Sequence, residues 1–279
     1  MEKYLRISVS AKQIERLCNT YGEALSDSLY GERLDQGRTS RVYSMVDGSM
    51  IFTREGGWKE VKLGRVFEQS DHLTIDSKHR NWIRNSQYVA HLGDLRGFLD
   101  NMETVIPTQS ELVFIADGAK WIWNWIESIY PEAVQILDFY HAKEHACEFA
   151  ALQFKDPKAR HQWIDQAQDW LMKDQLDLLI EEINQLKPIN QLAARAREKL
   201  LGYYWNHYHR MQYQSFQEKG LLIGSGPIES AHRTVIQQRL KRSGQRWITT
   251  NAQKVCNLRV ANLSNKWNLM IDLVMQNAA

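Results

Sequence analysis

The sequence predicts a mixed α/β fold, and three observations support this prediction. Two apolar segments, 112–116 and 133–137, have the length and composition of buried strands, and an amphipathic helical pattern separates them. Upstream, segments 42–53 and 58–67 are strand-like and flank a glycine turn, which predicts a hairpin. From residue 142 to about residue 220, helical periodicity continues without a strand, which indicates an inserted helical region.

The remaining elements follow in chain order. A helix is expected within the first 30 residues, with Ser10 as its N-cap and with an apolar stripe at Ile14, Leu17, Tyr21 and Leu25. A polar linker, 31–40, follows it. Residues 87–91 predict a third strand, and residues 92–105 predict an amphipathic helix.

The last predicted helix begins near residue 226. Ser225 or Gly226 can cap it, and Pro227 suits its first turn. Gly244 suits its C-terminal cap, which predicts a helix of roughly 17 residues.

The composition excludes several classes of protein. With 279 residues, 43% of them hydrophobic, the chain is long enough to bury a substantial core. No apolar run approaches the roughly 20 residues that a membrane span requires, so no membrane partner is expected. The three separated cysteines do not form a disulfide framework, and the N-terminus has no apolar signal region. A reduced, cytoplasmic protein is therefore expected.

Charge is distributed unevenly along the chain, although the net charge is only +2. Residues 230–271 contain no Asp or Glu but eight Lys and Arg: Arg233, Arg239, Lys241, Arg242, Arg246, Lys254, Arg259 and Lys266. Such a block suggests a polyanionic substrate. The alternative is a solvated helix face without a ligand.

Three acids stand in distinctive settings. Asp47 and Asp117 each follow an apolar, strand-like run and precede a glycine, whereas Glu229 stands in the first turn of the basic helix. Each Asp-Gly pair alone is more typical of a turn, and Glu229 alone could favour the helix dipole. Together, carboxylates from strand ends and from one helix can converge on divalent cations, which prefer oxygen ligands.

The order of hairpin, βαβ unit and acid-bearing helix is the ribonuclease H-like layout. The segment Ile223-Gly-Ser-Gly-Pro-Ile-Glu-Ser230, with the basic residues after it, resembles the C-terminal signature of bacterial insertion-sequence DDE transposases related to the Mutator-like elements. Val46-Asp-Gly48, 53–60, Asp117-Gly118 and Asp138-Phe-Tyr-His141 match its other blocks, in the same order, over residues 40–260.

The resemblance implies a chemistry and a function. Asp47, Asp117 and Glu229 would hold two Mg²⁺ ions, with Mn²⁺ as a substitute, for cleavage of a phosphodiester. The expected function is metal-dependent cutting of double-stranded DNA at insertion-sequence ends and strand transfer into target DNA, by a homo-oligomer assembled on that DNA. The alternatives are a structure-specific nuclease of the same fold and a truncated, non-catalytic remnant that only binds DNA.

Further residues are open to two interpretations. Asp138 and His141 are either an auxiliary pair at the site or a helix N-cap with a locally bonded histidine. Trp247 either stacks on a displaced base or belongs to the core. DNA phosphates are the expected partners of Arg233, Arg239, Lys241, Arg242 and Arg246.

The expected domains follow from these assignments. Residues 39–141 and 221–263 would form the catalytic domain, 142–220 its helical insertion, and 264–279 a C-terminal tail. Residues 1–38 would be the remnant of a DNA-binding region with its linker. A lone helix cannot form a reading head, so the chain is expected to be short at its N-terminus.

Overall fold

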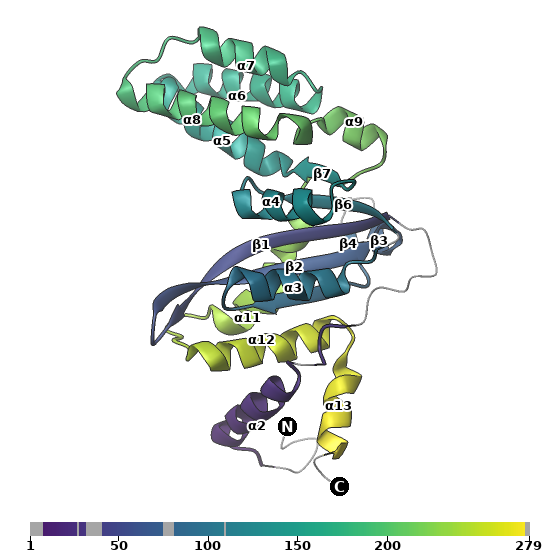
Figure 1. Ribbon diagram of the computed structural model, residues 1–279. Coiled ribbons are helices and arrows are strands. Elements are labelled where there is room, and N and C mark those ends of the chain that lie inside the picture. Colours follow the sequence, from purple (N-terminus) through teal and green to yellow (C-terminus); the bar gives the residue numbers. More distant parts are fainter. Residues whose placement is uncertain (1–7, 27, 32–40, 75–80, 109, 277–279) are drawn as a thin grey trace. The chain divides into compact units, whose positions relative to one another are not determined.

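The computed structural model is mixed α/β and divides into two compact units, which are described in turn (Figure 1). The first unit comprises Met1–Leu112 and Gly226–Ala279, and the second comprises Val113–Ser225. The structure describes residues 8–26, 28–31, 41–74, 81–108 and 110–276. The predicted linker 31–40 therefore lies, except for Gly31, outside the described residues.

An antiparallel sheet organises the first unit. Strand β1 (Arg41–Thr53) forms a hairpin with β2 (Gly57–Glu68), and β2 also pairs with β5 (Gln87–His91). The predicted hairpin and third strand are thus confirmed. The expectation that Asp47 ends a strand is wrong, because pairing continues through Asp47 and Gly48 to Thr53. Gly48 therefore lies within the paired strand rather than in a turn, with the Glu60 side chain beside it.

Helices α3 and α12 pack on this sheet. The predicted amphipathic helix is present as α3 (Leu95–Val105), which begins at the N-cap Asp94 and buries its apolar side against β2 and β5. Helix α12 (Thr249–Leu263) packs on β5, where Gln253 Nε2 donates to the Ala90 carbonyl at 2.9 Å. Helix α3 follows β5 directly in the chain, whereas α12 reaches the sheet from a segment distant in sequence.

A smaller sheet was not expected from the sequence. After the short turn η1 (Gln69–Asp71), strand β3 (His72–Thr74) pairs with β4 (Asn81–Ile83). Asp71 fixes the segment that follows β4, because its Oδ1 accepts from the Arg84 side chain at 3.1 Å.

The N-terminal helix α2 (Ala11–Ala24) docks on α12. The backbone of Lys254 approaches Gly22 so closely that a Cβ there would clash, and Asn257 Nδ2 donates to the Gly22 carbonyl at 2.9 Å. Of the predicted apolar stripe, Leu25 is buried, Tyr21 is half-buried, and Ile14 and Leu17 are exposed. Within the predicted tail, the described residues form a further helix, α13 (Trp267–Gln276).

The predicted helix from residue 226 is present but irregular and shorter than expected. It consists of α10 (Gly226–Ala231), the π-helix η3 (His232–Gln237) and α11 (Gln238–Leu240). Gly244 is not its C-terminal cap: the helix ends at Leu240, and Gly244 lies in the following loop with φ of +75°. The reason is competing backbone pairing, because Trp247 N donates to Phe52 O at 3.1 Å and ties the loop to the hairpin.

The second unit contains the predicted βαβ motif. Strand β6 (Glu111–Ala116), which starts at the unit boundary, pairs in parallel with β7 (Val134–Leu137), and α4 (Lys120–Ile129) connects them. Helix α4 buries two tryptophans and two isoleucines, which explains its strong apolar periodicity.

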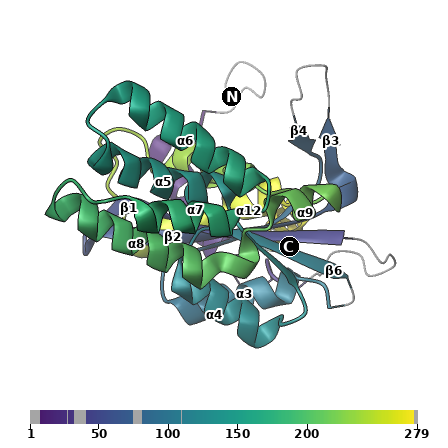
Figure 2. The ribbon, with the colours of Figure 1, turned by 90° about the horizontal axis from the view of Figure 1, so that it is seen from above.

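The rest of the second unit is helical, as the sequence predicts for 142–220. Its helices are α5 (Phe139–Gln153), α6 (Pro157–Met172), α7 (Leu176–Gln185), α8 (Gln191–His207) and α9 (Tyr213–Glu218). The first four pack in succession, and α8 returns onto α5 (Figure 2). Within the described residues, no helix combines the length and apolar character that crossing a membrane requires.

Candidate active site

In the first unit, Asp47 on β1 meets His232 on the helix that carries Glu229. His232 Nε2 lies 3.2 Å from Asp47 Oδ2, without the direction of a hydrogen bond. The histidine side chain is only 5% exposed, whereas the aspartate side chain is 38% exposed. Residues three apart share one side of a helical turn, so this contact directs the Glu229 side of the helix toward β1.

A buried arginine anchors that helix. Helix α10 packs on β1 and β2, and Arg65 Nη1 of β2 donates to the Pro227 carbonyl at 2.8 Å. Arg65 Nε donates to Ser86 Oγ at 3.0 Å, and the guanidinium lies 5.3 Å from the centre of the Tyr88 ring. These contacts fix the start of the helix, and therefore Glu229, relative to the strand that pairs with β1.

Asp117 begins the turn after β6 in the second unit. Its Oδ1 accepts from Ala119 N at 2.9 Å, and its carbonyl accepts from Trp123 Nε1 at 2.7 Å, so both ends of this residue are held at the start of α4. The Tyr203 ring packs so closely on Gly118 that a Cβ there would clash. Glycine follows Asp117 because this aromatic ring covers the turn.

Asp138 and His141 belong to a partly buried hydrogen-bonded cluster of the second unit. The Asp138 side chain is fully buried; its Oδ1 accepts from Tyr140 N at 2.8 Å, and its Oδ2 lies 2.9 Å from His141 Nδ1. Ser225 Oγ donates to the same Oδ2. Asp138 is therefore the N-cap of α5, and the local interpretation of this pair agrees with the structure.

The cluster fixes two charges. Burial alone would raise the pKa of the Asp138 carboxyl, but hydrogen bonds from His141, Ser225 and the Tyr140 N–H outweigh it and lower that pKa. The hydrogen bond to Asp138 raises the pKa of His141 to about 9, and the charge of Asp117 contributes to this rise. His141 is thus a cation at neutral pH, and its side chain is 41% exposed.

Aromatic residues of α8 surround the same region of the second unit. The Tyr203 hydroxyl is buried without a hydrogen-bond partner among the described residues, and burial together with the charges of Asp117 and Asp138 raises its pKa. The His207 ring packs at a tilt against the Tyr203 ring, with 4.9 Å between ring centres. Burial and the nearby Arg210 lower the pKa of His207 to about 4, so it is neutral at pH 7.

The basic block separates into two groups in the first unit. All five predicted DNA-binding residues are exposed: Arg233, Arg239, Lys241, Arg242 and Arg246. The other three hold the fold together. Lys254 pairs with Glu23 at 3.0 Å, Arg259 donates to the Thr234 carbonyl, and the buried Lys266 donates to the Leu29 carbonyl at 3.0 Å.

Trp247 is half-buried and belongs to the folded part of this loop. Its Nε1 donates to the Leu240 carbonyl at 3.0 Å, and the Arg239 guanidinium lies 5.6 Å from its ring centre. These contacts favour the core interpretation of Trp247 over exposure for base stacking.

The predicted acids are therefore distributed over both units. Asp47 and Glu229 belong to the first unit, Asp117 belongs to the second, and the three-acid set stays a prediction. Among the described residues, no group of three or more His, Cys, Asp and Glu is placed to hold a metal ion.

Sequence reasoning missed His232, Arg65, Ser225 as a partner of Asp138, and Tyr203. Only His232 had a signal, since it stands three residues after Glu229, one helical turn away. The other three contact their partners through tertiary packing, which leaves no local pattern.

Comparisons with known proteins give little. No family model and no curated protein matches this chain. One solved structure, described as "Drosophila P element transposase strand transfer complex", is similar with a TM-score of 0.27 and 8% identity, over 94% of this chain and 81% of that chain. A TM-score of this size carries no argument about fold or function.

Proposed function

We propose that this chain is a DDE transposase with a ribonuclease H-like catalytic domain, which cuts double-stranded DNA at the ends of a mobile element and joins them to target DNA. The observation that carries the proposal is the arrangement in the first unit. The helix bearing Glu229 is docked on β1 and β2, its His232 contacts Asp47, and five exposed cations follow Glu229.

The donor set fits divalent cations. Asp47 is half-buried and keeps a solvent-facing carboxylate, unlike Asp138, whose carboxylate is enclosed by three donors. Asp47, Glu229 and, by the sequence pattern, Asp117 would hold two Mg²⁺ or Mn²⁺ ions, which when bound activate the attacking hydroxyl and stabilise the leaving oxygen.

The remaining residues position these groups. His232 supports Asp47 from the protein side, Arg65 holds the start of α10, and the exposed cations bind DNA phosphates, which orients the duplex without reading its sequence. His141 presents a positive charge within the electrostatic field of Asp117 and adds a further phosphate contact in the second unit.

The decisive experiment is cleavage of a supercoiled plasmid that carries the genomic flanks of this coding sequence, with Mg²⁺ or Mn²⁺. The variants Asp47→Asn, Asp117→Asn and Glu229→Gln should each abolish nicking and remain folded. Asp100→Asn is the matched control, because its pair with Arg96 is exposed and worth little. Full cleavage by the triple variant would refute the assignment.

Strand joining separates transposition from simple nuclease activity. With pre-nicked ends and target plasmid, joined products are expected from the wild-type chain and not from Asp47→Asn. Nicking without joined products would instead indicate a structure-specific nuclease that uses the same acids.

A further inference from the structure

A pocket of about 360 Å³ lies between the end of the β1–β2 hairpin and the loop after α11 in the first unit. Ile51, Phe52 and Trp58 line it from the hairpin, and Lys241, Arg242 and Arg246 line it from the loop. This volume is within the range of about 300–1,000 Å³ that is typical of small-ligand sites. The pocket is therefore large enough for one planar ring system.

The loop wall is held in place by hydrogen bonds to the hairpin. Arg54 N donates to Trp247 O at 2.8 Å, and Lys241 Nζ lies 3.2 Å from Ser49 Oγ. Gly244 turns the chain between these attachments with a positive φ of 75°, which side chains rarely adopt. The pocket is thus a built feature of the fold.

An exposed aromatic ring stands at the pocket. Trp58 is 63% exposed, although its ring packs perpendicular to Phe52 with 5.4 Å between centres. Arg246 covers Phe52 from the loop, with its guanidinium 5.6 Å from the ring centre. The Phe52 ring supports the indole, most of which remains accessible to a stacking partner.

The positive charge of the pocket favours an anionic ligand. Three cations line it, and none of the described residues that line it is Asp or Glu. An aromatic platform beside a row of cations is the combination that binds an unpaired strand, because bases stack on the ring and phosphates pair with the cations. A duplex alone would use the cations and leave the cavity empty.

We infer that this pocket receives an unpaired nucleobase of a DNA strand, with Trp58 as its stacking partner and Lys241, Arg242 and Arg246 on the adjacent phosphates. The inference rests on the proposed function, since both require DNA. It adds that the chain binds DNA whose terminal bases are unpaired more tightly than a blunt duplex.

The test compares labelled duplexes by fluorescence anisotropy: one blunt, one with a short single-stranded overhang, and one whose overhang is abasic. The wild-type chain should prefer the overhang, and the abasic substitution should remove the preference. Trp58→Ala should weaken binding to the overhang by about tenfold, in the range that one stacked base contributes. Trp58→Phe should retain most of the preference.

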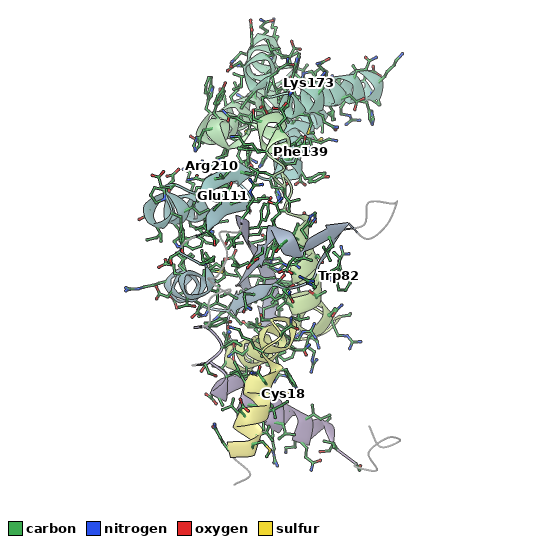
Figure 3. All side chains as sticks on the ribbon, turned by 90° about the vertical axis from the view of Figure 1, so that its right-hand side faces the viewer. Cys18, Trp82, Glu111, Phe139, Lys173 and Arg210 are labelled. Atoms are coloured by element: carbon green, nitrogen blue, oxygen red, sulfur yellow. The ribbon has the colours of Figure 1, made fainter. Side chains whose placement is uncertain are left out.

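Trp82→Ala is the matched control. Trp82 lies on β4 in the same unit, is 59% exposed (labelled in Figure 3), and is not among the residues that line the pocket. It should bind every substrate like the wild type. A 2-aminopurine in the overhang should be quenched by the wild type and by Trp82→Ala, but not by Trp58→Ala. Equal thermal unfolding of both variants excludes misfolding as the cause.

The outcomes separate this inference from the proposed function. If the chain binds all three duplexes equally, or if the two tryptophan variants behave alike, the pocket does not receive a base, while the proposed function is untouched. If the chain binds no duplex at all, the proposed function itself is refuted.

Discussion

Each unit contains an aspartate in contact with a histidine, and the two pairs are built in opposite ways. In the second unit the Asp138 side chain is completely buried and His141 is 41% exposed. In the first unit His232 is 5% exposed and Asp47 is 38% exposed. The buried partner is the acid in one pair and the base in the other.

Because of this difference, Asp138 stabilises the fold, whereas the Asp47 carboxylate remains available to bind an external ligand. Asp138 accepts hydrogen bonds from three donors and caps α5, so its negative charge is balanced by contacts within the protein. Asp47 has the buried imidazole on one side and solvent on the other, so its carboxylate can still take an external ligand. An aspartate beside a histidine can therefore have a structural or a ligand-binding role. Which role it has depends on whether the aspartate or the histidine is the exposed partner.

The largest expected effect is the loss of stability in Asp138→Ala. Removing this buried carboxylate leaves Ser225, the partly exposed His141 and the Tyr140 N–H without their acceptor, which should lower the free energy of unfolding by about 2–3 kcal/mol. Asp47→Ala should lower it by less than about 1 kcal/mol, because its side chain is partly solvated. Denaturant unfolding measures both, and equal losses would contradict the comparison.

The second expected effect is a pH dependence of the free energy of unfolding, caused by the titration of His141. Its folded pKa of about 9 lies above the unfolded value of about 6.5, so its contribution is complete below pH 6.5 and is lost as the pH rises to 9. Allowing for its partial exposure, the amplitude should be about 1–2 kcal/mol. His141→Gln should abolish this decline in unfolding free energy, whereas the exposed control His161→Gln should keep it.

The smallest expected effect is that of His232→Leu on the free energy of unfolding, and it is not a loss of stability. Both ring nitrogens of His232 are buried without a hydrogen bond among the described residues. His232→Leu removes these polar atoms and should leave the free energy of unfolding unchanged or raise it by up to about 1 kcal/mol. Thermal unfolding is the measurement, with His141→Leu as the contrasting variant that should destabilise. A clear loss in His232→Leu would show that the imidazole stabilises the fold.

The sequence predicted the secondary structure where the pattern was local. The hairpin and the βαβ motif followed from strand-like runs broken by glycine and from the apolar periodicity of α4. Asp138 as an N-cap was one of two local interpretations, and the structure agrees with it.

The predictions from sequence were wrong where contacts between residues distant in the chain determine the backbone conformation. Gly48 looks like a turn residue, yet it lies within β1, where it is paired with Lys62 of β2. Gly244 looks like a helix cap, but pairing of Trp247 with Phe52 draws the chain out of the helix earlier. Neither the pairing of Gly48 with β2 nor the pairing of Trp247 with Phe52 can be recognised from the glycine itself.

The π-helix between Glu229 and Arg239 has a consequence for how this protein tolerates change. Its wider turn holds an additional residue, so the positions after it are displaced by about one residue, or about 100° around the axis, from a regular α-helix. Substitutions along the segment alter only the chemistry of single positions. Deletion of one residue within His232–Gln237 would instead remove this displacement and leave a regular α-helix, with the later cations near their present direction relative to the acid.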